Sequence, residues 1–190
     1  MNFTDAVAAI NAETKRPDKA TAVKREINAA ITFYCLDNDF SRDLAERALV
    51  INANEYTQAF ALSECVRFRK FKYIKRGGTV NHLSVLGTNE MLKVCEDTDK
   101  YYIAGDSVNV KLAQLAATLD IGWYQYPPVL TGVTGANEFW LLDVSPWMII
   151  NRALSRVFKF IGDEKSAQLH AAMAREDYVA ARKDLGISTQ

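Results

Sequence analysis

Acid–base or nucleophilic chemistry in this chain would depend first on its histidines. His82 and His170 are the only two, and neither lies in a local Cys, Ser or Glu pattern typical of a nucleophile and its base. Sequence alone leaves open a pairing in space. For His170, which falls in a segment with helical periodicity, we favour a role in packing or on the helix surface.

The second candidate for chemistry is a group of carboxylates beside two tyrosines. Glu96, Asp97 and Asp99 precede Tyr101 and Tyr102. A metal site or an acid–base pair would need such a group, but acidic residues clustered in a loop are more often simply solvated. A small enzyme that uses this cluster is therefore the weakest of three functional hypotheses.

Other motifs that carry chemistry are missing from the sequence. Neither a G-x-x-x-x-G-K-[ST] nor a G-x-G-x-x-G phosphate-binding loop occurs. The odd number of cysteines (Cys35, Cys65 and Cys95) and the lack of a C-x-x-C pair favour free, buried thiols over disulfides or zinc ligands. We expect no catalytic residue, no metal and no cofactor, and therefore a protein that is not an enzyme.

The strongest electrostatic feature is the stretch RFRKFKYIKR, residues 67–76. Six of its ten residues are basic, none is acidic, and aromatic residues are interleaved. It could show a basic face to a nucleic-acid backbone, be steered toward an acidic partner protein, or protect a sheet edge with charges. We favour edge protection slightly, because the whole chain is neutral. The basic residues are Arg67, Arg69, Lys70, Lys72, Lys75 and Arg76.

Length and composition describe an ordinary globular protein. The chain has 190 residues, 49% hydrophobic and 24% charged, with 23 basic and 23 acidic residues. This length suits one domain, residues 1–190. No stretch resembles a signal peptide or a membrane span, so we expect a soluble protein made in a cytoplasm, without membrane contact.

The elements that would position these residues fall into three regions. Apolar residues at helical spacing predict a helical pair over residues 3–36, with Thr4 able to cap the first helix. Residues 44–126 are rich in strand patterns. One of these starts at Tyr56 and slips by one residue near Lys70, which predicts a β-bulge there. A turn at Gly77-Gly78 ends this pattern.

The rest of the β-rich region predicts a hairpin and a closing strand. Tyr101 and Tyr102 should point to opposite sheet faces, and residues 104–106 should form the turn. Three apolar residues then return on one face of the hairpin, and three more line one face of the closing strand before Pro127-Pro128. These two sets are Val108, Val110 and Leu112, and Leu119, Ile121 and Trp123.

A second helical pair is predicted over residues 145–185. Ser145-Pro146 is typical of a helix start, and Gly162-Asp163 of a break followed by a new cap. The apolar face of the first of these helices should include Trp147 and Leu154. Its solvent-exposed face should include Asn151, Arg152, Ser155, Arg156 and Lys159. In the second helix, small residues form a seam that could pack within the fold or between subunits: Ala171, Ala174, Tyr178, Ala181 and Leu185. The expected fold class is α+β, a helical bundle from both chain ends with a central antiparallel β-sheet insertion.

Several segments in this order resemble a known family. They are DNDFSRDLAE, RFRKFKYIKRGG, YYIAGDSVNVKLAQ, LDIGWYQYPP and SPWMIINRALSRVFKFIGDEKSAQ. Together they resemble the head-to-tail connector (adaptor) proteins of tailed bacteriophages, including podovirus tail-tubular-protein-A-like members. Residues 79–93 contain no matching feature.

The resemblance implies a structural virion protein of the neck or tail, assembled in the host cytoplasm. In that family a helical bundle with a β insertion forms a ring, usually of twelve copies, under the portal protein. The ring extends the channel for packaged double-stranded DNA toward the tail, where the tail or nozzle protein is the next partner, and the family brings no catalytic residues. A tail-tube, nozzle or tail-completion protein of the same virion is the alternative. We expect the polar chain end to dock on portal: Leu185, Gly186, Ile187, Ser188, Thr189 and Gln190.

Overall fold

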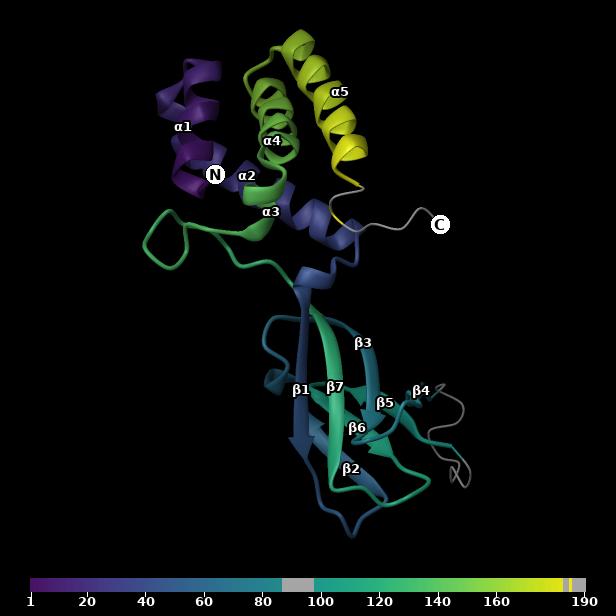
Figure 1. The fold of residues 1–190 in the computed structure, drawn as a ribbon. Coiled ribbons are helices and arrows are strands. Elements are labelled where there is room, and N and C mark those ends of the chain that lie inside the picture. Colours follow the sequence, from purple (N-terminus) through teal and green to yellow (C-terminus); the bar gives the residue numbers. More distant parts are fainter. Residues whose placement is uncertain (87–97, 183–184, 186–190) are drawn as a thin grey trace. The chain divides into compact units, whose positions relative to one another are not determined.

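The chain forms two compact units in the computed structural model, which describes residues 1–86, 98–182 and 185 (Figure 1). The helical unit comprises residues 1–42 and 127–190, and the β unit comprises residues 43–126. Both helices and strands are present, so the α+β class is confirmed. The sequence was interpreted as one domain, but each unit has its own cluster of buried apolar side chains.

Five α-helices make up the described part of the helical unit. They are α1 (Phe3–Thr14), α2 (Ala20–Asp37), α3 (Trp140–Val144), α4 (Pro146–Phe160) and α5 (Glu164–Ala181). Single 3-10 turns lie at Pro17–Lys19 and Ser41–Asp43. The predicted helical pairs correspond to α1 with α2 and to α4 with α5.

The first helix starts differently from its prediction. Asn2, not Thr4, caps α1, because its side chain accepts the amide of Asp5 and the Asp5 carboxylate accepts the amide of Asn2 in return. Thr4 instead donates its hydroxyl and its amide to Asn137 Oδ1. The cap prediction was wrong because Asn2 and Asp5 together satisfy two free amides.

The start of α4 and the corner between α4 and α5 follow the sequence signals. Pro146 occupies the start of α4, although the Ser145 side chain makes no capping hydrogen bond. Gly162 adopts a φ of 84°, which favours glycine, and ends the helix. Asp163 then caps α5 by accepting the amide of Ser166 at 3.0 Å.

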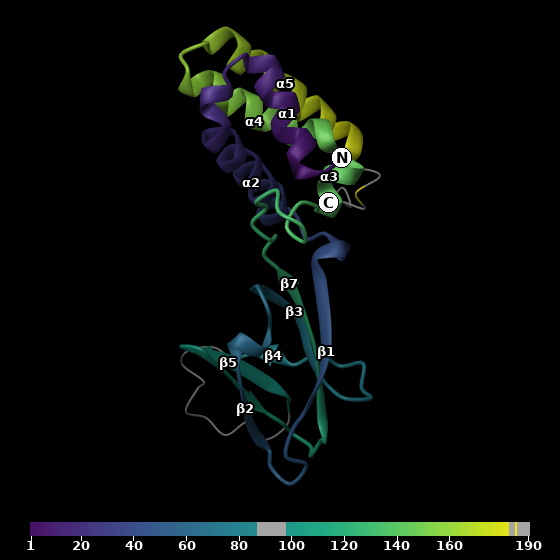
Figure 2. The same cartoon turned by 90° about the vertical axis from the view of Figure 1, so that its left-hand side faces the viewer.

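Helix α4 is the centre of the helical unit, since α1, α2 and α5 all pack against it (Figure 2). Contact on several sides buries more of α4 than one amphipathic face would. Asn151, predicted on the solvent-exposed face, is buried. Trp147, predicted in the core, is 57% exposed. Two other residues predicted on the solvent-exposed face contact α2. Arg152 Cζ lies 3.3 Å from the centroid of the Phe33 ring, and Arg156 Nε lies 3.1 Å from Glu26 Oε2.

The small-residue seam of α5 serves the fold itself. Ala174 and Ala181 are buried and Ala171 and Tyr178 are partly buried, on the side of α5 that packs against α4. Leu185, which follows the end of the helix, is buried as well. Small side chains allow two helices to approach closely. The opposite side of α5 is exposed to solvent.

The described strands of the β unit form two sheets around one core. They are β1 (Leu44–Val50), β2 (Thr57–Ala61), β3 (Phe68–Arg76), β4 (Ser84–Val85), β5 (Lys100–Ala104), β6 (Ser107–Lys111) and β7 (Thr118–Gln125). The sheet orders are β1-β7-β3 and β2-β6-β5-β4. The sequence predicted a single antiparallel sheet, but two sheets form and the short β4–β5 pair is parallel.

Strand β3 contains two register shifts against β7, one between Phe68 and Lys70 and one between Phe71 and Tyr73. The predicted bulge near Lys70 is confirmed, and a second one follows it. Two extra residues bring Phe68, Phe71 and Ile74, spaced by three, into contact with the same core. The strand pattern does not run unbroken from Tyr56, since a 3-10 turn at Leu62–Glu64 interrupts it.

The predicted hairpin and closing strand are confirmed. Strands β5 and β6 pair around Gly105, which has a φ of 59°. Apolar side chains of β6 and β7 alternate into the core as expected, and the Trp123 indole donates to the carbonyl of Val66 at 3.1 Å. The buried set is Val108, Val110, Leu112, Leu119, Ile121 and Trp123.

Truncating Leu154 tests the central position of α4. Leu154 is 3% exposed, so we expect Leu154→Ala to lower the free energy of unfolding by about 2–5 kcal/mol. Trp147→Ala is the control, because an exposed side chain on the same helix should change stability by less than about 0.5 kcal/mol. Urea unfolding followed by circular dichroism at 222 nm compares the two; equal midpoints would contradict the burial of Leu154.

Candidate functional site

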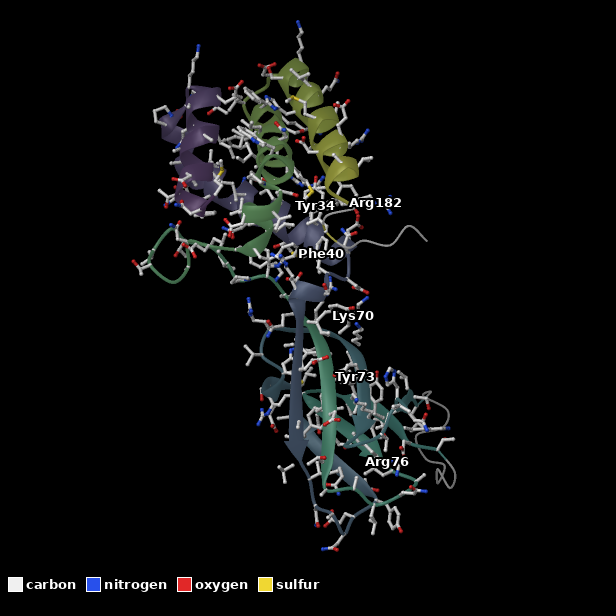
Figure 3. All side chains as sticks on the ribbon, in the orientation of Figure 1. Tyr34, Phe40, Lys70, Tyr73, Arg76 and Arg182 are labelled. Carbon is white, nitrogen blue, oxygen red and sulfur yellow. The ribbon has the colours of Figure 1, made fainter. Side chains whose placement is uncertain are left out.

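The candidate site is the basic strand β3, which lies at one edge of the three-stranded sheet. Figure 3 shows Lys70, Tyr73 and Arg76 following one another along this strand. The far end of the edge is partly covered, because Leu83 donates its amide to the carbonyl of Ile74 at 2.6 Å. The uncovered part of the edge carries Arg69, Lys70 and Lys72, as expected for a strand that must avoid pairing with another chain.

Most of the six predicted site cations have partners inside the β unit. Arg67 donates to Gln125 at 2.9 Å, and Arg69 and Lys70 lie 5.3 Å and 5.7 Å from the Tyr124 ring centroid. Lys75 lies 3.8 Å from Asp120, and Arg76 Nε lies 2.6 Å from Asp99. Lys72 is exposed. Much of the positive charge is therefore engaged within the unit.

Asp99, one of the three clustered carboxylates, has a structural role because it forms an ion pair with Arg76. Asp99 accepts Arg76 Nε through one oxygen and the amide of Ala113 at 2.8 Å through the other. Its side chain is only 9% exposed. Glu96 and Asp97 lie outside the described residues. Asp99 thus ties β3 to the residues flanking β5 and β6.

The outer face of the three-stranded sheet carries a second polar group centred on Tyr73. Its hydroxyl donates to Glu46 Oε1 at 2.9 Å, and its ring stacks on His82 with centroids 5.4 Å apart. Burial and the bond to Glu46 raise the pKa of Tyr73 to about 12. Gly122 leaves room for the ring, since a Cβ there would come within 2.5 Å of it. Tyr73 therefore remains a neutral donor at physiological pH.

The strand also borders an apolar groove of about 420 Å³. Phe68 and Phe71 line one part of it, and Leu86, Tyr101 and Tyr102 line another. Tyr101 meets Phe71 edge-to-face at 5.7 Å, so one of the two adjacent tyrosines packs on the core as predicted. The groove has the character of a place for an apolar side chain or ring.

A buried polar chain in the helical unit was missed by the sequence analysis. His170 Nδ1 lies 2.9 Å from Asn151 Oδ1, and Asn151 Nδ2 donates to Asp177 Oδ2 at 2.8 Å. In this arrangement His170 donates from Nδ1, since Asn151 Oδ1 can only accept. The imidazole also stacks flat on Phe158 at 5.3 Å. The packing role favoured for His170 is confirmed; no sequence signal linked it to Asn151.

The predicted portal-docking residues are only partly described. Leu185 is buried among the helical core residues and donates its amide to the carbonyl of Ala181 at 2.9 Å. Its burial leaves little side-chain surface for a partner. Gly186, Ile187, Ser188, Thr189 and Gln190 lie outside the described residues.

Cysteine, histidine and acidic side chains are the residues that could bind a metal ion or react as nucleophiles. Cys35 and Cys65 are buried thiols that are not joined in a disulfide, and burial raises the pKa of the Cys65 thiol to about 11. Cys95 is not among the described residues. Within residues 1–86 and 98–182, no group of three or more His, Cys, Asp or Glu side chains could hold a metal. None of the described helices is long and apolar enough to cross a membrane.

Comparison of the sequence with protein-family models finds no match, and comparison with curated proteins finds none either.

Replacing Asp99 tests its structural role. We expect Asp99→Asn to destabilise the β unit by on the order of 3 kcal/mol, because it leaves the partly buried Arg76 without its counter-charge. The control Asp120→Asn breaks a more exposed pair and should cost less than about 1 kcal/mol. Native-state hydrogen exchange at β6 and β7 amides reports this unit separately. If the Asp99→Asn variant protected these amides from exchange as well as the wild type does, the structural role of Asp99 would be contradicted.

Glutamine substitutions test whether β3 meets DNA. We expect the assembled protein to bind duplex weakly, without sequence preference and less tightly as salt rises, because phosphate contacts release counterions. Replacing Arg67, Arg69, Lys72 and Lys75 together should abolish this binding. The control replaces four exposed cations of the helical unit: Lys15, Lys24, Arg25 and Arg175. Fluorescence anisotropy at several salt concentrations measures both sets, and equal binding by both would leave only edge protection.

Proposed function

We propose that the protein is a structural virion protein, a head-to-tail connector that forms a ring between portal and tail. The observation that supports this best is the chain path. Both chain ends build one helical unit, and residues 43–126, between α2 and α3, form a separate β unit. A helical bundle with a β insertion is the architecture that the resemblance implies.

The two units suit different tasks within the proposed ring. The helical unit has an extensive apolar core organised around α4, which makes it a stable framework for contacts with neighbouring copies. The β unit carries the basic strand β3, whose exposed Lys70 and Lys72 could reach a phosphate backbone or an acidic partner. In this proposal the helical unit assembles and the β unit contacts the channel or the tail.

Assembly should depend on the portal. A portal ring would hold many copies side by side, so their high effective concentration would make weak lateral contacts sufficient. We expect a monomer or small oligomer in dilute solution and a closed ring, of about twelve copies as the resemblance implies, on portal. Light scattering of the protein with and without portal measures this assembly.

Removing Gly186–Gln190 tests the docking end. The truncated chain keeps Leu185, which packs in the helical core, so its fold should remain intact while its capture by immobilised portal weakens. Circular dichroism checks the fold. Absence of portal-dependent assembly, with equal capture of both chains, would contradict the connector role. Capture by tail or nozzle protein alone would favour the tail-component alternative.

A further inference from the structure

Helix α5 has an apolar face that no described part of the chain covers. Leu169 is 59% exposed, Met173 39% and Val179 67%, and Ala172 and Ala180 are exposed as well. All five lie on the side of the helix opposite the residues that pack against α4. Single exposed apolar residues are normal, but Leu169, Ala172 and Met173 lie within five residues on one exposed stretch of this helix.

The positions along this face repeat with the spacing of a helix–helix seam. Lys165, Leu169, Ala172, Glu176 and Val179 follow one another at intervals of four, three, four and three residues. Alternating intervals of four and three keep one line of side chains facing a partner helix. All five side chains are exposed in the chain alone.

The charges on this seam indicate which partner fits it. A basic residue, Lys165, precedes its apolar centre and an acidic residue, Glu176, follows it. If a second α5 runs antiparallel, Lys165 of each copy meets Glu176 of the other, and Leu169 meets Ala172. A parallel second copy would instead oppose Lys165 to Lys165 and Glu176 to Glu176. The face is therefore self-complementary in the antiparallel arrangement only.

We propose that two copies of this protein associate through antiparallel pairing of their α5 helices along this seam. The contact is isologous, so the same residues serve on both copies and the assembly closes at two. It is distinct from the head-to-tail contact that a ring needs, and it does not depend on the connector role. Pairing in this register covers the apolar centre of the seam, Leu169 and Ala172.

The expected strength follows from the size of the contact. A single pair of helix faces buries less than the roughly 1,200 Å² typical of stable complexes, so the dimer should be weak and concentration-dependent. Its two symmetric ion pairs are exposed at the rim of the contact, so association should weaken as the salt concentration rises. The apolar centre does not depend on charge, so some association should remain at high salt.

Charge reversal of the full-length protein, without portal, tests the pairing. In sedimentation velocity over a concentration series, Lys165→Glu alone and Glu176→Lys alone should each weaken dimerisation about tenfold, because two attractive pairs become repulsive. The double variant K165E/E176K restores opposite charges at both positions and should associate as the wild type does. Leu169→Gln, at an exposed position, should abolish association without loss of helical circular dichroism.

The controls reverse charges elsewhere on the helical unit. Lys24→Glu and Glu13→Lys change the same net charge at exposed sites on α2 and α1, and both should dimerise normally. A wild-type protein that sediments as a monomer at all concentrations would overturn the proposal. A double variant no better than the single variants would also overturn it. Because portal is absent, neither result bears on portal-dependent ring formation.

Discussion

The helical unit depends on the burial of α4 from several sides at once. Its buried side chains point toward α1, α2 and α5, so no single partner helix could cover them. Two of these helices come from the start of the chain and one from the end. The unit can therefore be completed only when both ends of the chain are present, and the β unit must be accommodated between them.

Polar contacts then fix how the helices around α4 are aligned. Asn151 of α4 donates to Asp177 and accepts from His170, and these two hydrogen bonds hold α5 in one register against α4. On the side of α2, Tyr178 donates to Asn38 at 2.8 Å, and Asn38 donates to the carbonyl of Tyr34 at 2.9 Å. Apolar packing alone would tolerate small shifts of these helices. A change of register would leave several of these polar side chains without hydrogen-bond partners, which is costly inside a protein.

Sequence patterns predicted the elements well where one side of an element faces the core. The alternation of Val108 and Val110 and the spacing of Val23 and Ile27 correspond directly to buried positions. Prediction failed for α4, because one amphipathic face describes a helix covered on one side only, so Asn151 was assigned to solvent. The basic stretch was recognised, but the pairing of Arg76 with Asp99, 23 residues later, depends on a sheet arrangement that local periodicity cannot reveal.

The pairing of β1 with β7 has a consequence for the folding of the helical unit. Leu44 lies opposite Tyr124, so the chain enters and leaves the β unit on adjacent strands at one end of the same sheet. Neighbouring antiparallel strands lie roughly 5 Å apart. Once this sheet has formed, the long insertion behaves as a tight connection, and most of the entropy of closing a long loop has already been lost. Early formation of the β1–β7 ladder would thus bring the two halves of the helical unit together before α4 is covered.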